Sequence, residues 1–585
     1  MNKRLMLGNE AVARGAWEAG AAFGTGYPGT PSTEILEALA QYKDVETQWA
    51  PNEKVAYEVA MGAVLAGART LVTMKHVGLN VAADPLFSSS YMGVHGGLVV
   101  VSADDPGMHS SQDEQDNRYL ARAAKVLMLE PADVEEARWM TREAFALSER
   151  FDSPVILRMT TRVCHQTGVA LMHDREEAGV KGYKKDIPKN VLLPSHSRQR
   201  RHNVEDRLRE ALAFGNESDF FNPIIEGTSH VGVVTSGVSF GYVREAVPDA
   251  SVLKIGLSNP IPMDRIRKFA ATVKKLYVVE ELEPYLEEAM LAAGVEVEGK
   301  VLRPYTGELN ISLVEKMLLG KASHQSEIDL GGLEVPPRPP TLCPGCGHRS
   351  MFTLFRDMHL RVMGDIGCYT LGALKPLKAM DSCMCMGASL GMAEGLEKFG
   401  GEKEKGKTVG VIGDSTFFHS GVPTIIDMLY NKSTTTVVIL DNSVTAMTGA
   451  QPHPGTGKDI HGGEAPKLNV ADVCRALGVR RVVQVDPYDM ENAKKVLEEE
   501  LAAKELSVVV AVAPCVLAHR VTLGAPVDID LELCNRCGAC VRVGCMALHE
   551  QEGFPEIDPD LCNGCGVCAQ VCEEAAITLH REPVS

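Results

Sequence analysis

Apolar and polar positions follow two alternating patterns along most of the chain. Short apolar runs, such as residues 98–102, 408–412, 436–440 and 507–512, predict buried strands, whereas the longer mixed run 52–68 predicts a helix. Strands that alternate with helices in this way are typical of parallel sheets covered by helices. The pattern therefore predicts an α/β protein.

Changes in this pattern divide the 585 residues into five segments. Two α/β segments are separated by a charged, irregular stretch that is expected to be a linker with some helix. A Pro-rich stretch at 333–340 then precedes a third α/β segment. A chain of this length is too long for one core, so several domains are expected. The predicted segments are a first domain at 1–175, the linker at 176–228, two further domains at 229–325 and 326–522, and a small, Cys-dense α+β domain at 523–585.

The composition argues against several classes of protein. The 59 basic and 77 acidic residues give a net charge of −18, which disfavours nucleic acid as a partner because phosphates would be repelled. One basic cluster, residues 196–202, is expected to be a solvated linker. No stretch has the roughly 20 apolar residues that cross a bilayer, and no signal-peptide pattern is present, so a cytoplasmic protein without a membrane partner is expected. There, the 16 cysteines are predicted to hold metals rather than form disulfides.

Eight cysteines near the C-terminus form two runs that each begin C-x2-C-x2-C. A tight loop of this spacing directs three thiolates at one cubane, and the pattern closely resembles bacterial two-cluster ferredoxins. That resemblance implies that the fourth cysteine of each run binds the other cluster. One additional residue before Cys545 and the lack of Pro after each fourth cysteine depart from the pattern but leave the ligands in place. A zinc ribbon, the alternative, has its ligands in two pairs. The implied sets are Cys534, Cys537, Cys540 and Cys572 for a first [4Fe–4S] cluster, and Cys545, Cys562, Cys565 and Cys568 for a second.

Two strand ends in the segment 326–522 offer oxygen ligands to a metal ion. The run G-D-S at 413–415 ends one strand, and D-N-S at 441–443 ends another, with Asn442 28 residues after Asp414. Adjacent parallel strands would place both side chains at the carboxyl edge of a sheet, and oxygen ligands suit a hard divalent cation. The spacing resembles the motif of thiamine-diphosphate enzymes, with Ser in place of a third motif Gly. The alternative is a strand-end Asp with an unrelated turn Asn. The residues implied to bind the cofactor and Mg2+ are Gly413, Asp414, Asn442 and the carbonyl of Val444.

Two further positions resemble parts of the thiamine site. Glu53 opens a helix, as does the Glu that hydrogen-bonds the pyrimidine ring and promotes deprotonation of the thiazolium carbon in these enzymes. The alternative for Glu53 is a favourable interaction with the helix dipole, worth roughly 0.3–1 kcal/mol. Gly387, in the run M-G-A-S, resembles the backbone segment that lies against the cofactor ring. Both residues are therefore predicted to contact thiamine diphosphate.

Four more cysteines resemble a third cluster site. The run C-P-G-C-G at 343–347, upstream of the thiamine motif, strongly resembles the 2-oxoacid:ferredoxin oxidoreductases. In that family, cysteines in such a run, in a D-I-G-C run and in a P-C-V run bind a [4Fe–4S] cluster next to the thiamine. The alternatives are a zinc site and inert thiols. The implied ligands of this proximal cluster are Cys343, Cys346, Cys368 and Cys515. Four cysteines stay unassigned, with buried structural thiols as the default: Cys164, Cys383, Cys385 and Cys474.

Substrate-binding residues are expected in the first domain. Thr30 lies in Y-P-G-T-P-S, which resembles a family loop near the substrate; the alternative is a loop of turn-forming residues. Lys75-His76 replaces a small-residue stretch of the family, so Lys75 or His76 is a candidate to orient the substrate carboxylate. The alternative for His76 is a helix cap or a contact with the cofactor only.

The order of the segments resembles the alpha subunits of the arylpyruvate-acting branch of this family. Segments 1–175 and 326–522 correspond to pyrimidine and diphosphate modules, and 229–325 to a transketolase C-terminal-like domain. The resemblance implies oxidation of indolepyruvate or a similar arylpyruvate with CoA to an arylacetyl-CoA and CO2, with ferredoxin as acceptor. It also implies a smaller beta subunit, in an assembly of two copies of each. Alternatives are an oxidoreductase for pyruvate, 2-oxoglutarate or a branched-chain oxoacid, a non-oxidative thiamine decarboxylase, and a simple electron-transfer subunit.

Overall fold

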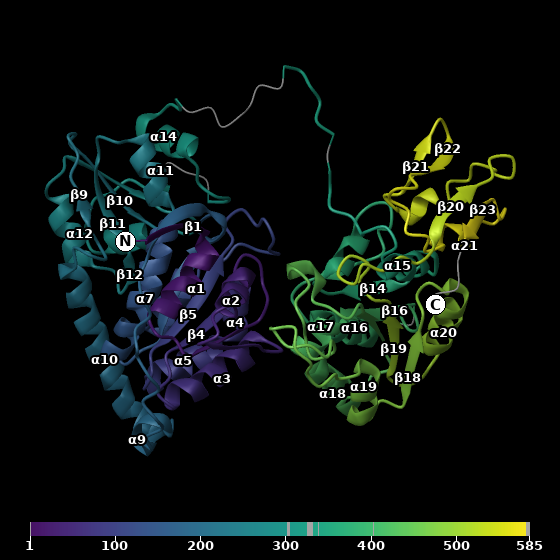
Figure 1. The fold of residues 1–585 in the computed structure, drawn as a ribbon, viewed down its shortest axis with the longest axis horizontal. Helices are drawn as coiled ribbons and strands as arrows, with labels where there is room; N and C mark the ends of the chain where they lie inside the picture. Colours follow the sequence, from purple (N-terminus) through teal and green to yellow (C-terminus); the bar gives the residue numbers. More distant parts are fainter. Residues whose placement is uncertain (1, 301–304, 324–330, 337, 402, 581–585) are drawn as a thin grey trace. The chain divides into compact units, whose positions relative to one another are not determined.

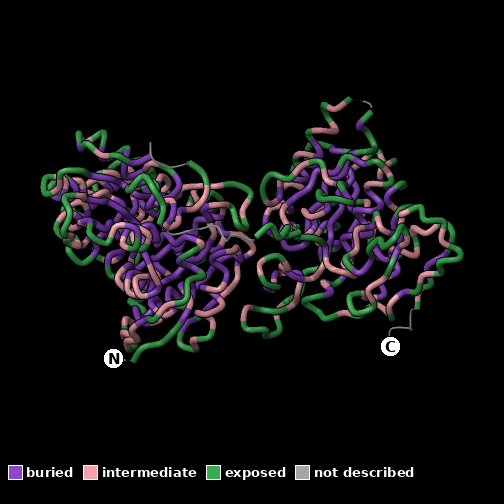
Figure 2. Tube along the Cα trace, turned by 90° about the horizontal axis from the view of Figure 1, so that it is seen from above, coloured by how far each residue is buried: buried purple, intermediate pink, exposed green. Residues whose placement is uncertain are grey.

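The chain forms two compact units, 1–334 and 335–585 (Figure 1). The computed structural model describes residues 2–300, 305–323, 331–336, 338–401 and 403–580. The predicted border between residues 325 and 326, and the last five residues of the C-terminal domain, lie outside this described part. In each unit, buried backbone is concentrated in the interior and exposed backbone in the outer loops (Figure 2). The predicted α/β class is confirmed.

A seven-stranded sheet is the centre of the N-terminal unit. Its order is β12-β6-β7-β5-β4-β2-β3, and neighbouring strands are parallel except β12 and β6. The apolar run predicted as a buried strand is confirmed, because all seven residues of β5 are buried. The strands are β2 (Phe23–Gly26), β3 (Glu46–Trp49), β4 (Thr70–Lys75), β5 (Leu98–Asp104), β6 (Leu127–Leu129), β7 (Val155–Thr160) and β12 (Leu257–Asn259).

Helices cover both faces of this sheet. α3, α5 and α6 share an apolar core with Val72, Val100 and Ile156. Because alternate strand residues point to opposite faces, Val99 and Val101 face the other way, where α7 contacts β5 and β7. The helices of this part are α1 (Gly8–Glu18), α2 (Thr33–Leu39), α3 (Glu53–Leu65), α4 (His76–Val81), α5 (Ala83–Met92), α6 (Arg118–Ala124), α7 (Val134–Arg150) and α8 (Thr161–His165). A separate antiparallel pair is formed by β1 (Asn2–Leu7) and β8 (Thr167–Met172).

The segment 229–325 has its own sheet, of order β13-β10-β11-β9. The strands β10, β11 and β13 form a small parallel sheet, and β9 is added antiparallel to β11. However, the chain continues from β11 into β12, which joins the seven-stranded sheet. The elements are β9 (Ile224–Ile225), β10 (Val231–Ser236), β11 (Ser251–Ile255), β13 (Lys275–Val279), α11 (Ser239–Ala246), α12 (Met263–Ala270), α13 (Tyr285–Ala292) and α14 (Ile311–Leu319).

The stretch predicted as a linker contains α9 (Ile187–Asn190) and a single long helix, α10 (Pro194–Glu217). The basic cluster lies on α10 and is not solvated throughout. Arg200 is buried, and its guanidinium donates to the Asp152 carboxylate at 2.7 Å and to the Tyr91 carbonyl at 2.6 Å. The prediction of a solvated cluster is therefore wrong at Arg200, because α10 packs on α5.

A six-stranded parallel sheet of order β15-β14-β16-β17-β19-β18 is the centre of the C-terminal unit. The strands predicted at 408–412, 436–440 and 507–512 are confirmed as β16, β17 and β19. The strands are β14 (Arg361–Gly364), β15 (Ser382–Cys383), β16 (Thr408–Gly413), β17 (Thr436–Asp441), β18 (Arg481–Val485) and β19 (Ser507–Val512). The helices are α15 (Gly347–Asp357), α16 (Ala388–Phe399), α17 (Asp414–Thr416), the π-helix η3 (Phe417–Gly421), α18 (Val422–Tyr430), α19 (Val470–Leu477) and α20 (Met490–Leu501), with short 3-10 turns at η2 (Cys368–Ala373) and η4 (Ala446–Thr448).

The Cys-dense segment is a small domain of two antiparallel strand pairs within the same unit. It packs against α15 (Figure 1), and Val543 and Val567 share an apolar core with Phe352 of that helix. Its elements are β20 (Ala525–Ile529), β21 (Leu548–Gln551), β22 (Phe554–Ile557), β23 (Ile577–His580), η5 (Val541–Val543) and α21 (Val567–Gln570).

Candidate active site

The residues predicted to bind the metal ion lie at one edge of the six-stranded sheet. β16 and β17 are parallel neighbours, with Gly413 opposite Leu440. Asp414 follows β16 directly and Asn442 follows β17 directly, as the spacing predicted. Asp414 is only 2% exposed. The carboxyl edge therefore holds a buried carboxylate and an amide oxygen on adjacent strands.

Hydrogen bonds fix the Asp414 carboxylate in place. It accepts from the backbone N–H groups of Ser415 at 3.0 Å and Ser443 at 2.8 Å, and from His453 Nε2 at 3.1 Å. Asn442 Oδ1 accepts from the Val444 N–H at 3.2 Å. His453 was not predicted, because it lies 39 residues beyond Asp414 in a loop without a recognisable motif.

Asp441 makes this edge more negative. Burial and the charge of Asp414 raise the pKa of Asp441 to about 6. Two carboxylates at one buried edge repel each other unless a proton or a cation lies between them. The oxygen donors and the excess negative charge both fit a divalent cation with oxygen ligands.

Gly387 and Asp365 shape the adjoining loop. Gly387 has φ +87°, and a Cβ there would lie 2.4 Å from Ser420 Cβ, so only glycine fits. Its N–H donates to Asp365 Oδ2 at 2.7 Å, and Ser389 Oγ donates to the same oxygen at 3.0 Å. Burial raises the pKa of Asp365 to about 6. Asp365 was not predicted, because the D-I-G-C run was interpreted only through its cysteine.

Glu53 lies at the corresponding edge of the sheet in the N-terminal unit. It is the first residue of α3, and the Asn52 side chain caps this helix by accepting from the Val55 N–H at 2.9 Å. Glu53 is 6% exposed, and a Cβ on Gly78 would lie 2.6 Å from its Oε1. The absence of a side chain at Gly78 therefore leaves room for the Glu53 carboxylate.

Thr30 follows β2, Lys75 is the last residue of β4 and His76 comes directly after it, all at the same edge as Glu53. Ser110 joins two of them: its Oγ donates to the Thr30 carbonyl at 3.2 Å, and Lys75 Nζ donates to its carbonyl at 2.7 Å. Burial lowers the pKa of Lys75 to about 8, although the carboxylates of Asp105 and Asp113 oppose this shift. The structure thus brings the predicted substrate residues together.

His76 is the first residue of α4 and is fully buried. Its Nε2 lies 3.3 Å from the Asp113 carbonyl, and its own carbonyl accepts from Asn117 Nδ2 at 3.1 Å. Its Nδ1 has no hydrogen-bond partner within the described residues. A buried imidazole with one unsatisfied nitrogen suits contact with a bound molecule.

The four cysteines predicted for the proximal cluster surround one cavity of about 160 Å³. Burial raises the pKa of the Cys346 thiol to about 12 and that of Cys368 to about 11, and neighbouring cysteines of the set contribute to both shifts. Asn442 also lines the cavity, and its carbonyl accepts from the Cys515 N–H at 3.0 Å. Thiols that resist ionisation in this way need a nearby cation, which fits the irons of a cluster.

The cysteines of the C-terminal domain gather in the crossed sets that the ferredoxin resemblance implied. Cys572 lines a small cavity together with the first three cysteines of the other run, Cys534, Cys537 and Cys540. In the other set, burial raises the pKa of Cys568 to about 12, and the neighbouring thiols that raise it further include Cys545. Cys545 thus lies near the second set despite the additional residue before it.

The four unassigned cysteines differ in their surroundings. Cys164 and Cys474 are buried, as expected for structural thiols. Cys383 and Cys385 are exposed, so the default expectation is wrong for them, because β15 is a two-residue edge strand. Within the described part of the chain, no three His, Cys, Asp or Glu side chains form a site for a single metal ion.

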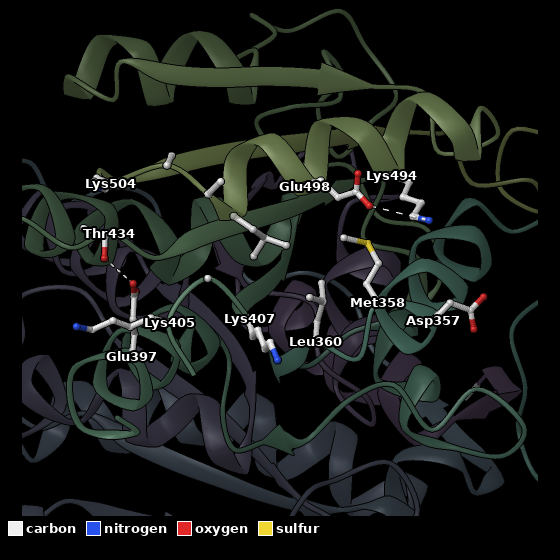
Figure 3. Close-up of a pocket in the computed structure, with 14 residues that line it drawn as sticks. Asp357, Met358, Leu360, Glu397, Lys405, Lys407, Thr434, Lys494, Glu498 and Lys504 are labelled. Carbon is white, nitrogen blue, oxygen red and sulfur yellow. Dashed lines mark hydrogen bonds and ion pairs between the residues drawn. The ribbon is translucent and has the colours of Figure 1, made fainter. Parts of the chain in front are cut away.

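A larger, open groove of about 1070 Å³ lies elsewhere in the C-terminal unit (Figure 3). It runs beside Lys407 and Thr434, which precede β16 and β17, and is therefore at the opposite end of the strands from Asp414. Glu397 accepts from Thr434 there, and Glu498 lies 4.0 Å from Lys494. None of the predicted site residues lines this groove. The larger volume therefore does not identify it as the active site.

Comparisons with known families match three parts of the chain. Residues 14–203 match the thiamine-diphosphate-binding model of pyruvate flavodoxin/ferredoxin oxidoreductases, and 365–511 match the C-terminal binding domain of thiamine pyrophosphate enzymes. Residues 554–577 match a 4Fe-4S binding domain. Among the described residues, no helix has both the length and the apolar character needed to cross a membrane.

Several archaeal proteins are similar over nearly the whole chain, and each is named indolepyruvate oxidoreductase subunit IorA. The protein of Archaeoglobus fulgidus is 40% identical over 92% of this chain and 96% of its own length. That of Methanothermobacter thermautotrophicus is 39% identical over 98% and 97%. That of Pyrococcus horikoshii is 37% identical over 94% and 92%.

Proposed function

We propose a function from the premise that this chain belongs to the family of indolepyruvate oxidoreductase IorA subunits. The chain catalyses oxidative decarboxylation of arylpyruvates, such as indolepyruvate, phenylpyruvate and hydroxyphenylpyruvate, and transfers the electrons through iron–sulfur clusters. The balanced reaction consumes one arylpyruvate, one CoA and two oxidised ferredoxins. It yields one arylacetyl-CoA, one CO2, one proton from the CoA thiol and two reduced ferredoxins.

One observation supports this function over the alternatives. Asn442, at the metal-binding edge, lines the same cavity as Cys343, Cys346, Cys368 and Cys515. A non-oxidative decarboxylase has no use for a cysteine set beside its cofactor, and a simple electron-transfer subunit has no use for the metal-binding edge. The shared cavity supports a site in which the residues proposed to bind the electron-accepting cluster lie next to a residue proposed to bind the cofactor.

We assign the diphosphate end of the cofactor to the C-terminal unit. Asp414, Asn442 and the Val444 carbonyl would hold Mg2+, and the hydrogen bonds to Asp414, one to each carboxylate oxygen, keep the carboxylate oriented. Gly413 and Gly387 allow close approach of the backbone. Thiamine diphosphate, when bound, supplies the carbon nucleophile that attacks the 2-oxo group and accepts the electrons left by CO2.

Glu53 would hold the pyrimidine ring of the cofactor by a hydrogen bond through which a proton can be exchanged. Its buried carboxylate lies where few solvent molecules compete for that hydrogen bond. Thr30, Lys75 and His76 bind the substrate: the Lys75 ammonium faces the carboxylate, and the unsatisfied His76 Nδ1 offers a second polar contact. Lys75 is the stronger candidate for the carboxylate, because it carries the charge and shares Ser110 with Thr30.

Electrons would pass between the clusters in the order in which the cysteine sets neighbour one another. We propose three [4Fe–4S] clusters: the proximal one, then the set with Cys565, then the set with Cys540. Tyr488 is close to both Cys346 and Cys565, since both thiols contribute to its raised pKa. Cys540 likewise influences the pKa of Cys568. The cluster held by the set with Cys540 would then supply the electrons to soluble ferredoxin.

The family members are named as subunits, so a second, smaller subunit is expected to complete the enzyme. We propose an assembly with two copies of each chain. We also propose a cytoplasmic location and sensitivity to oxygen, because twelve cysteines on three clusters require reducing conditions.

The test is a substrate panel with the anaerobically purified two-subunit complex. Indolepyruvate and phenylpyruvate should support CoA-dependent reduction of ferredoxin with higher kcat/KM than pyruvate, 2-oxoglutarate or branched-chain oxoacids. A higher kcat/KM for pyruvate or 2-oxoglutarate would refute the arylpyruvate assignment. Release of an aldehyde without ferredoxin reduction would indicate the non-oxidative alternative.

A further inference from the structure

Arg349 joins the proximal cysteine loop to the ferredoxin domain. It lies in the first turn of α15, three residues after Cys346, and is 2% exposed. Its Nη2 donates to the carbonyls of Leu342 and, at 3.4 Å, Cys343. Its Nη1 donates to the carbonyls of Val543, at 3.1 Å, and Gly544. One guanidinium therefore binds the loop before Cys346 and the loop before Cys545.

This cation is buried without a counter-ion. All four of its hydrogen bonds go to neutral carbonyls, and no carboxylate of the described residues pairs with it. Its Nε is also buried and has no partner in the described part of the chain. A buried, unpaired charge costs several kcal/mol, so its burial implies compensation by negative charge in the working protein.

Cysteine thiolates on both sides of Arg349 can provide this compensating negative charge. Burial raises the pKa of the Cys343 and Cys346 thiols in the proximal set and of Cys565 in the second ferredoxin set, and the nearby charge of Arg349 opposes each of these rises. Close packing supports this arrangement: a Cβ on Gly345 would lie 2.7 Å from Asn563, between Cys562 and Cys565. The guanidinium thus adjoins two sets of four cysteines.

We propose that Arg349 is a positioning residue for electron transfer, which fixes the distance between these two clusters and raises the reduction potentials of both. The proposal rests on the proposed function, because it requires the proximal and second clusters. Each cluster gains one negative charge when it is reduced, and a buried positive charge stabilises that state. Because one cation raises the reduction potentials of both clusters, the difference between the two potentials stays small. An electron is therefore not held on one cluster at the expense of transfer to the other.

Arg356 provides a matched control. It lies two turns further along α15 and also donates to a carbonyl of the ferredoxin domain, that of Arg542, at 2.6 Å. Its charge, however, is paired with Asp357 at 2.8 Å and is partly exposed. Arg356→Gln therefore removes one cation and one hydrogen bond to the same domain without changing a buried, unpaired charge.

The experiment is an EPR-monitored redox titration of the full two-subunit complex and its variants, with iron analysis. Arg349→Gln should lower the midpoint potentials of the proximal and second clusters. At the parent midpoints, the ratio of reduced to oxidised cluster should fall at least tenfold, which is 59 mV for one electron. The cluster with Cys540, identified by loss of its signal in Cys572→Ser, should shift less. Arg349→Lys, which keeps the charge, and Arg356→Gln should stay near the parent values.

Three results would overturn the proposal. Unchanged potentials in an iron-replete Arg349→Gln enzyme would show that the charge has no effect on the clusters. An equal shift in Arg349→Lys would show that charge is not the cause. Loss of iron from both Arg349 variants would indicate a purely structural role. If the parent complex itself lacks a proximal cluster, the iron analysis shows this before any variant is compared, and the cluster assignment fails instead.

Discussion

Replacing Asp441 by Asn should stabilise the protein when the cofactor and Mg2+ are removed. Asp441 lies beside Asp414, and its Oδ1 accepts from the Ser443 N–H at 3.0 Å and from Ser443 Oγ at 3.2 Å. The amide of Asn keeps this acceptor. Its NH2 group also replaces the proton that Asp441 shares with Asp414 in the acid form. The substitution therefore preserves the contacts and removes a charge.

The size of the effect follows from the pKa of Asp441, which is raised from 3.8 to about 6. A raised carboxyl pKa means that the folded state holds the proton more tightly than the unfolded state. The resulting stability is present below about pH 4 and is lost as the pH rises through about 6. At about pH 7.5 the free energy of unfolding is lower by about 3 kcal/mol than at low pH for this reason, and about half of this decrease develops above about pH 5.

The assay is the thermal unfolding of cofactor-free protein across this pH range. For a unit of about 250 residues, the part lost between about pH 5 and about pH 7.5 corresponds to a Tm decrease of about 3–5 °C. Wild-type protein should show this decrease and Asp441→Asn should not, whereas Asp472→Asn, at an exposed ion pair of α19, should behave like wild type. Thiamine diphosphate with Mg2+ should remove the advantage of the Asp441→Asn variant. Parallel Tm curves for wild type and Asp441→Asn would refute the reasoning.

Four further substitutions test the assigned site residues. Cys572→Ser and Cys545→Ser should each remove one cluster and about four irons, and the EPR signals lost should differ between them; loss of the same signal would contradict the crossed sets. Glu53→Gln should keep thiamine diphosphate binding, measured by calorimetry, but lose most turnover, because Gln cannot exchange the proton; full activity would exclude this role. Asp414→Ala should abolish Mg2+-dependent cofactor binding, since the cation loses its charged ligand, and retention of cofactor at wild-type affinity would remove Asp414 from the site.

The sequence by itself predicted several of the strands and named the candidate ligands. β5, β16, β17 and β19 were predicted because fully buried strands of a parallel sheet read as continuous apolar runs. The cysteine runs and the pair Asp414 and Asn442 were recognisable because their chemistry requires several ligands at fixed, short spacing. Such local patterns are complete within a few tens of residues and need no knowledge of long-range packing.

Tertiary structure decided how distant segments share a surface. The burial of Arg200 depends on Asp152, 48 residues away, and the role of Asp365 depends on the N–H of Gly387. Arg349 binds a loop 195 residues further along the chain. These interactions have no sequence period, because a buried polar group is satisfied by whichever atoms the packed fold brings within about 3 Å. The sequence shows which side chains can donate or accept hydrogen bonds, but only the folded structure shows which of them are bonded to each other.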